Sequence, residues 1–224
     1  MPTAVRHKKA TLNLRRLGIF VLIGAGAVFF WHSPVLAPLK IFVVFLHETG
    51  HALATVFTGG RVVSMVVTPW ESGYVEYVGG MPVVITSAGY VGSALFGGLL
   101  LRLAGRPRWA TTTFTGLAVL FSLVTLWFVR NPFGIVFGLG TAAVCSILVW
   151  KRFPGVHYLL DVLAVMSTLY ALYDLSDFLR IGAMTDAVIL AQMTRLPAFL
   201  WALLWSVISL LVVIIAGLRT LTRP

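Results

Sequence analysis

Two histidines and a glutamate stand together in an apolar stretch in the first quarter of the chain. The segment 45–53 reads FLHETGHAL and contains the pattern HExxH, formed by His47, Glu48 and His51. On a helix with about 100° per residue, His47 and His51 lie about 40° apart, so both imidazoles can bind one metal ion. Zinc suits neutral imidazole ligands, and its catalytic sites keep one position open for water. Glu48 would then take a proton from that water as it attacks a carbonyl carbon.

A third protein ligand is needed, because HExxH supplies only two. The chain has seven Asp and Glu residues in total, so the search is short. We favour Asp174, since it lies deepest in an apolar run, where an aspartate costs about 2.5–3.5 kcal/mol on insertion scales and a metal ion would offset that cost. The alternatives left open by the sequence are Asp186, Asp177 and Asp161.

The composition requires that this site lie in a membrane protein. Of the 224 residues, 59% are hydrophobic and only 11% are charged. A soluble domain carries about 25% charged residues, so this chain could not cover a globular surface with polar groups. The single cysteine, Cys145, excludes a disulfide framework and a thiolate zinc cluster. We therefore predict an all-α membrane protein with zinc as its cofactor.

The positions of the basic residues also indicate a membrane protein. The net charge is +10, which in a soluble protein would suggest nucleic acid. Here the Lys and Arg residues mostly stand at the ends of apolar runs, where they anchor helices at lipid headgroups, so we expect no nucleic-acid partner. We divide the chain into a basic tail, 1–16, and one multi-pass membrane domain, 17–224. Cleavage of 1–37 as a signal peptide is disfavoured because Pro38 would follow the cut.

Apolar runs of membrane-spanning length predict six or seven transmembrane helices. The first is short and the others are separated by breaks rich in Pro and Gly. The expected spans are 17–31, 39–57, 81–103, 111–129, 133–150, 156–179 and 197–218. Gly59 and Gly60 should end the span that carries HExxH, because glycine tolerates the left-handed conformation past a helix end.

Residues 61–78, directly after HExxH, read as a short β-hairpin. Runs rich in Val, Met and Tyr at 61–67 and 73–78 flank a segment of turn-forming residues, 68–73. Two strands alone are marginally stable, so this hairpin must lean on the membrane domain or gain a partner strand.

With these features in place, the chain resembles the site-2-protease-like zinc metallopeptidases of membranes. The resemblance is carried by HETGHAL at 47–53, GGRV at 59–62, the hairpin, and SAGYVG at 87–92, and it extends over roughly 40–206. It is closest to the compact bacterial branch that lacks a PDZ domain. The late motif Leu-Asp-Gly of the better-known branch is absent, and the pair Asn131-Pro132 matches its asparagine-proline stretch only in part, so we expect no oxyanion role for Asn131.

The resemblance implies a protease that cuts membrane-protein or membrane-anchored peptide substrates within the bilayer of the cell membrane. It implies that His47 and His51 are zinc ligands and that Glu48 is the general base. The hairpin could hold an extended substrate by strand addition. The alternatives are a non-catalytic membrane scaffold and a metal-binding or transport protein.

Overall fold

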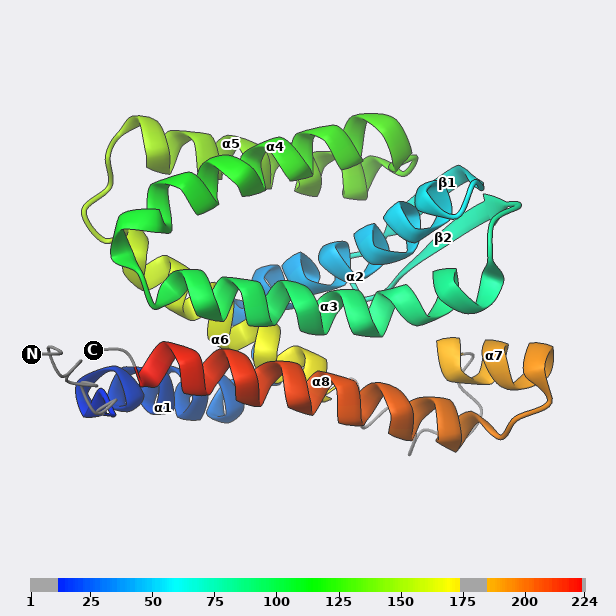
Figure 1. Cartoon of the computed structure of the whole chain (residues 1–224). Helices are drawn as coiled ribbons and strands as arrows, with labels where there is room; N and C mark the ends of the chain where they lie inside the picture. Colours follow the sequence, from blue (N-terminus) through cyan, green and yellow to red (C-terminus); the bar gives the residue numbers. More distant parts are fainter. Residues whose placement is uncertain (1–11, 174–184, 223–224) are drawn as a thin grey trace, which may run out of the picture.

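The computed structural model of the chain describes residues 12–173 and 185–222, and Figure 1 shows their arrangement. In chain order, the helices and strands of these residues are α1 (Leu14–Phe29), the short 3-10 helix η1 (Pro34–Leu36), α2 (Ala37–Phe57), β1 (Arg61–Val67), β2 (Gly73–Val78), α3 (Pro82–Ala104), the 3-10 helix η2 (Pro107–Trp109), α4 (Ala110–Phe128), α5 (Pro132–Trp150), α6 (Val156–Tyr173), α7 (Asp186–Thr194) and α8 (Ala198–Leu221).

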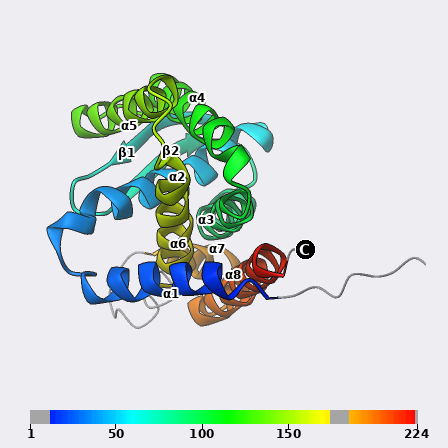
Figure 2. The ribbon, with the colours of Figure 1, turned by 90° about the vertical axis from the view of Figure 1, so that its left-hand side faces the viewer.

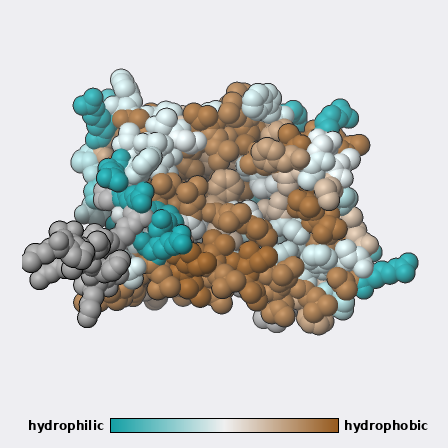
Figure 3. Space-filling view, in the orientation of Figure 1, coloured by the Kyte–Doolittle hydropathy of each residue, from teal (hydrophilic) through white to brown (hydrophobic). Residues whose placement is uncertain are grey.

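The predicted all-α membrane fold is confirmed. Within the described residues, five helical segments are long and apolar enough to cross a bilayer: Pro34–Phe57, which joins η1 and α2, and the helices α3, α4, α5 and α8. The sequence also predicted spans at 17–31 and 156–179. The structure has α1 there, with 16 residues, and α6, whose described part has 18 residues and borders residues outside the described ranges. Figure 3 shows hydrophobic residues across the middle of the face that carries α3 and α8, and hydrophilic residues toward its two ends. The chain is a multi-pass membrane protein.

The HExxH helix α2 lies at the centre of the molecule, packed against α3, α6 and the hairpin (Figure 1). Its buried side chains include Phe45 and Leu46, which are fully enclosed. Close contact with α3 depends on Gly50, because a Cβ there would collide with the carbonyl oxygen of Ala88. The helix ends as the sequence predicted, with Gly59 at a φ of +81°, in the left-handed region.

The predicted hairpin is confirmed at its expected bounds, with β1 and β2 antiparallel and Val67 opposite Gly73 next to the turn. It leans on the membrane domain through the connection between α4 and α5. The amide of Arg130 donates to the carbonyl oxygen of Met65 at 3.0 Å, and Val129 forms a parallel bridge with Met65. The outer edge of β1 is therefore already hydrogen-bonded to the protein.

Asn131 extends this contact with its side chain. Its Nδ2 donates to the carbonyl oxygen of Val67 at 2.7 Å, and its Oδ1 accepts from the amide of Val67 at 3.2 Å. The carboxamide thus pairs with β1 as the backbone of a neighbouring strand would. No role was predicted for Asn131, and the structure identifies it as a brace of the hairpin.

The helix α7 was not predicted, since the sequence analysis treated its residues as a connection before the last span. The helix begins at Asp186, and the side chain of Thr185 caps it by accepting from the amide of Val188. A small apolar cluster holds α7 against α3 and α8, and its buried members are Tyr90, Ala187, Leu190, Ala202 and Trp205. The rings of Tyr90 and Trp205 stack in this cluster with centroids 4.9 Å apart.

An ion pair ties α1 to α6 at the opposite end of α3. Arg16 contacts Asp161 at 2.8 Å and also donates to the carbonyl oxygen of Ala104 in α3. Figure 2 shows α6 running between α1 and the α4–α5 pair. Asp161 therefore has a structural partner far from HExxH.

Candidate metal centre

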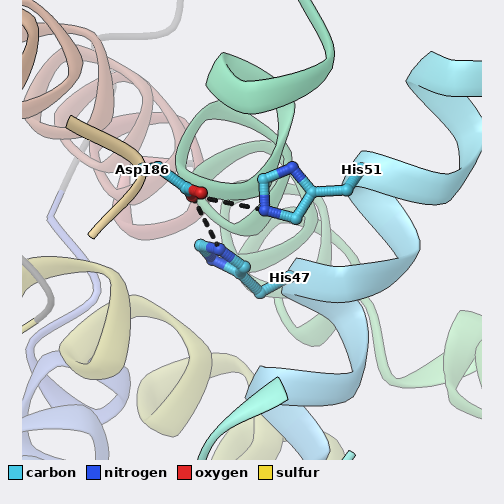
Figure 4. A group of neighbouring side chains, drawn as sticks. All are labelled: His47, His51 and Asp186. Atoms are coloured by element: carbon cyan, nitrogen blue, oxygen red, sulfur yellow. Dashed lines mark hydrogen bonds and ion pairs between the residues drawn. The ribbon is translucent and has the colours of Figure 1, made fainter. Parts of the chain in front are cut away.

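Three potential ligands converge from two elements that are far apart in the chain. His47 and His51 project from one face of α2, as predicted, and Asp186 reaches them from the first residue of α7 (Figure 4). The Nε2 atoms of His47 and His51 lie 3.3 and 3.2 Å from Oδ2 of Asp186. One ligand atom of each residue lies within 4.8 Å of the other two.

These distances fit a tetrahedral zinc ion. Ligand atoms bound at about 2.0–2.1 Å from zinc lie about 3.4 Å apart along the edges of a tetrahedron. The two distances to Asp186 therefore match such an edge. The set of two imidazoles and one carboxylate is also a donor set that zinc takes in catalytic sites, with the fourth position open.

Both imidazoles are oriented by their other nitrogen. Nδ1 of His51 is 2.7 Å from the carbonyl oxygen of Ile85, to which it donates, and this leaves Nε2 as the lone-pair donor for a metal. Nδ1 of His47 is 3.3 Å from Oγ of Ser93. Such contacts fix the ring orientation and the tautomer of metal-binding histidines. Ile85 and Ser93 both lie on α3, so this helix orients the two rings.

Gly89 on α3 leaves the room that the centre needs. A Cβ at this position would collide with Nε2 of His47 and with Nε2 of His51. The glycine therefore faces the point where the two ligand atoms meet. This explains in physical terms why the segment 87–92, which supports the family resemblance, carries a glycine here.

Glu48 follows His47 on α2 and is buried. Its Oε2 has no hydrogen-bond partner among the described residues. A buried polar atom without a partner is costly unless water or a ligand satisfies it. Gly73, the first residue of β2, packs directly on this side chain, because a Cβ there would lie 2.7 Å from Cγ and 2.8 Å from Oε1 of Glu48. The hairpin thus holds the carboxylate beside the candidate metal centre.

A cavity of about 450 Å³ gives access to these side chains. It is lined by the three potential ligands, by Glu48 and by residues of β2, including Tyr74, Val75 and Tyr77. No residue of β1 lines it, so β2 is the strand that faces the site. Binding cavities for small ligands have volumes of about 300–1,000 Å³, so this cavity has the size of a ligand-binding site.

The electrostatics favour an ionised carboxylate at Asp186. Desolvation by partial burial acts to raise the pKa of this group. When the imidazoles carry a proton on Nε2, the charge of His51 and hydrogen bonds from both rings outweigh that effect and hold the pKa of Asp186 below its usual range. Asp186 is therefore in the anionic form that a metal ligand requires.

The four acidic candidates can now be compared by position. Asp186 is next to both imidazoles, whereas Asp161 is paired with Arg16 on α1. Asp174, the residue that the sequence favoured, and Asp177 lie outside the described residues. Depth within an apolar run favoured Asp174, but the sequence also held a signal for Asp186. Thr185 followed by Asp186 ahead of an apolar run is a typical helix start, which would have predicted α7 and its first residue.

A family model described as Peptidase M50B-like matches residues 20–216, which include all three potential ligands, Glu48 and the hairpin. Neither the curated proteins nor the solved structures contain a match.

Proposed function

Since the chain belongs to the Peptidase M50B-like family, we propose that it is an intramembrane zinc endopeptidase of the cell membrane, with membrane proteins or membrane-anchored peptides as substrates. Family membership supports a metallopeptidase and agrees with the resemblance to site-2-protease-like enzymes without a PDZ domain. The observation that supports zinc-dependent peptide cleavage by this chain is Oε2 of Glu48, which is buried and lacks a partner among the described residues, beside two imidazoles and a carboxylate. A scaffold that used these residues only for packing would have no need for an unsatisfied carboxylate oxygen there.

His47, His51 and Asp186 would hold the zinc ion, with Asp186 in the role that we predicted for Asp174. When bound, zinc would supply Lewis-acid activation of water for attack on a peptide carbonyl. Oε2 of Glu48 accepts the proton of that water. The same carboxyl group then delivers the proton to the amide nitrogen that leaves, so Glu48 returns to its ionised form after each cleavage.

The substrate must reach this centre as an extended segment, because helical hydrogen bonds cover the carbonyls of a membrane helix. The edge of β2 is suited to hold such a segment, since β1 is already paired on both of its sides and β2 lines the cavity. A strand added to β2 would form main-chain hydrogen bonds that are independent of side-chain identity. The hairpin therefore supports both the unwinding of the substrate and its placement at Glu48.

Peptides methylated on backbone nitrogens test the strand addition. A peptide that the enzyme cleaves is compared with the same sequence N-methylated at the residues next to the cleaved bond. We expect the methylated peptide to be cleaved at least tenfold more slowly, because it lacks donors for strand pairing. Equal cleavage of both peptides would contradict strand addition.

Zinc content and turnover together test the catalytic proposal. We expect the purified chain to bind one zinc ion, and Glu48→Gln to keep the ion while losing at least about 100-fold in cleavage rate, as expected for loss of a general base. Asp186→Ala should lose zinc, whereas Asp161→Ala, at a residue outside the centre, should keep it. Unchanged turnover of Glu48→Gln would remove the base from the mechanism, and a chain that binds no zinc would favour the scaffold.

A further inference from the structure

A second cavity, of about 660 Å³, adjoins the one that holds the candidate metal centre. The two cavities share Glu71 and Tyr170 as lining residues. Four aromatic residues, Trp31, Trp70, Tyr170 and Tyr173, line the second cavity together with polar and small residues. Its volume is within the range of ligand-binding cavities, about 300–1,000 Å³. No step of the proposed mechanism uses it.

The charged groups of this cavity neutralise each other. Nζ of Lys40, on α2, contacts Oε1 of Glu71 at 2.6 Å and lies 5.6 Å from the centre of the Trp31 ring. Lys40 is buried, with 6% of its surface exposed, so its ammonium group depends on these two partners. The cavity therefore presents aromatic surface and a compensated ion pair, which favours an uncharged occupant.

The ion pair also fixes the turn that joins the two cavities. Glu71 has a φ of +58°, in the left-handed region, and lies in the turn between β1 and β2. Such a conformation is unfavourable in a residue other than glycine, so it persists only where surrounding contacts hold it. The contact with Lys40 can hold Glu71 in this conformation.

The course of β2 links this turn to the chemistry. Gly73 touches Glu48, so a peptide paired with β2 has its reacting bond near the first residue of that strand. On one side of the bond, the peptide lies along residues 74–78. On the other side it would pass Glu71, which lines both cavities.

We propose that the second cavity is a substrate subsite. It binds the part of the substrate on the side of the cleaved bond next to the hairpin turn, and it selects an aromatic side chain. This inference rests on the proposed function. Trp70, at the hairpin turn, is 85% exposed and supplies a ring that is available for stacking. An aromatic residue of the substrate would lie between Trp70 and the ring-lined wall formed by Trp31 and Tyr173.

Peptide binding to the full chain with Glu48→Gln tests the subsite separately from turnover. The probes are fluorescent 12-residue peptides of Ala, Ser and Leu, in which a single Phe occupies successive positions, and the same peptide without Phe. With zinc present, we expect Phe at one position to lower Kd by about fivefold, in keeping with the contribution of an aromatic pair. Adding Trp70→Ala should abolish this preference, and adding Trp70→Phe should retain it.

Trp127→Ala is the matched control, because Trp127 on α4 is also exposed but lines neither cavity. This variant should keep the preference. The proposal is overturned if no Phe position binds more tightly, or if Trp70→Ala leaves the preference unchanged. Cleavage of the same peptides by the unmodified chain separates the two proposals. Cleavage without a Phe preference refutes the subsite alone, whereas a preference without cleavage refutes the protease and leaves a peptide-binding cavity.

Discussion

Replacement of Gly89 by alanine should strongly weaken zinc binding without unfolding the protein. The added Cβ would overlap the Nε2 atoms of both His47 and His51. Non-bonded atoms are most stable at about 3.5–4.0 Å, so both rings must move by about 1 Å or more. Disturbing the surroundings of a single ligand costs about 10–100-fold in metal affinity. Because two ligands move here, we expect a loss of at least about 100-fold, or about 2.7 kcal/mol.

Two further glycines provide matched controls for the same substitution. A Cβ at Gly92, one turn along α3, would lie 3.4 Å from Cα of Gly50, and a Cβ at Gly116 on α4 would meet nothing within 4 Å. Alanine is favoured over glycine in a helix by about 0.8–1.0 kcal/mol, so Gly116→Ala should be as stable as the parent or more stable. Both control variants should bind zinc.

Zinc affinity is measured by competition with a chromophoric chelator, and folding by thermal unfolding of the zinc-free protein in detergent. Gly89→Ala should unfold at a temperature close to that of the parent and show weak zinc binding. If Gly89→Ala bound zinc as tightly as Gly116→Ala does, the rings would not meet in front of Gly89. The assignment of the metal centre to this face of α3 would then be wrong.

Three further substitutions probe the supports of the site. Ser93→Ala removes the partner of Nδ1 of His47 and should weaken zinc binding by about tenfold in the chelator assay, and an unchanged affinity would show that the ring is oriented without it. Asn131→Ala removes two hydrogen bonds from β1 and should lower the free energy of unfolding by about 1–3 kcal/mol while zinc stays bound. Loss of zinc in that variant would contradict a purely bracing role. Trp205→Ala opens the cluster that holds α7, so it should cost about 3–5 kcal/mol of stability and weaken zinc binding through Asp186. Tight zinc binding by a folded Trp205→Ala protein would show that α7 is held by other contacts.

Much of the fold follows from local signals in the sequence. The ends of α2 and of the hairpin could be predicted because glycines and turn-forming residues stand at the boundaries, and Gly59 adopts the expected left-handed conformation. The length of the apolar runs predicted the five helical segments that are long and apolar enough to cross a bilayer among the described residues. The run at 17–31 was short in the sequence, and α1 has 16 residues in the structure.

The candidate site was predictable only where its residues are close in sequence. His47 and His51 share a face of α2 because of the helix period, so their spacing is sufficient. Asp186 is 139 residues away from His47, and its approach depends on how α7 packs on Tyr90 and Trp205. Asp161 and Asp186 both lie near the start of a helix. Only their tertiary contacts show that Asp161 pairs with Arg16 and Asp186 with the imidazoles.

The brace formed by residues 129–131 limits how copies of this chain can associate. An exposed sheet edge normally invites other chains to extend the sheet, and repeated extension produces fibrils. Here β1 is bonded on both sides, which leaves β2 as the open edge of the hairpin among the described residues. If two molecules paired through β2, the open edge of each hairpin would be hydrogen-bonded to the other molecule. Growth by edge pairing would therefore stop at a dimer. Such a dimer would also cover the cavity beside Glu48, so self-association through this edge and substrate entry exclude each other.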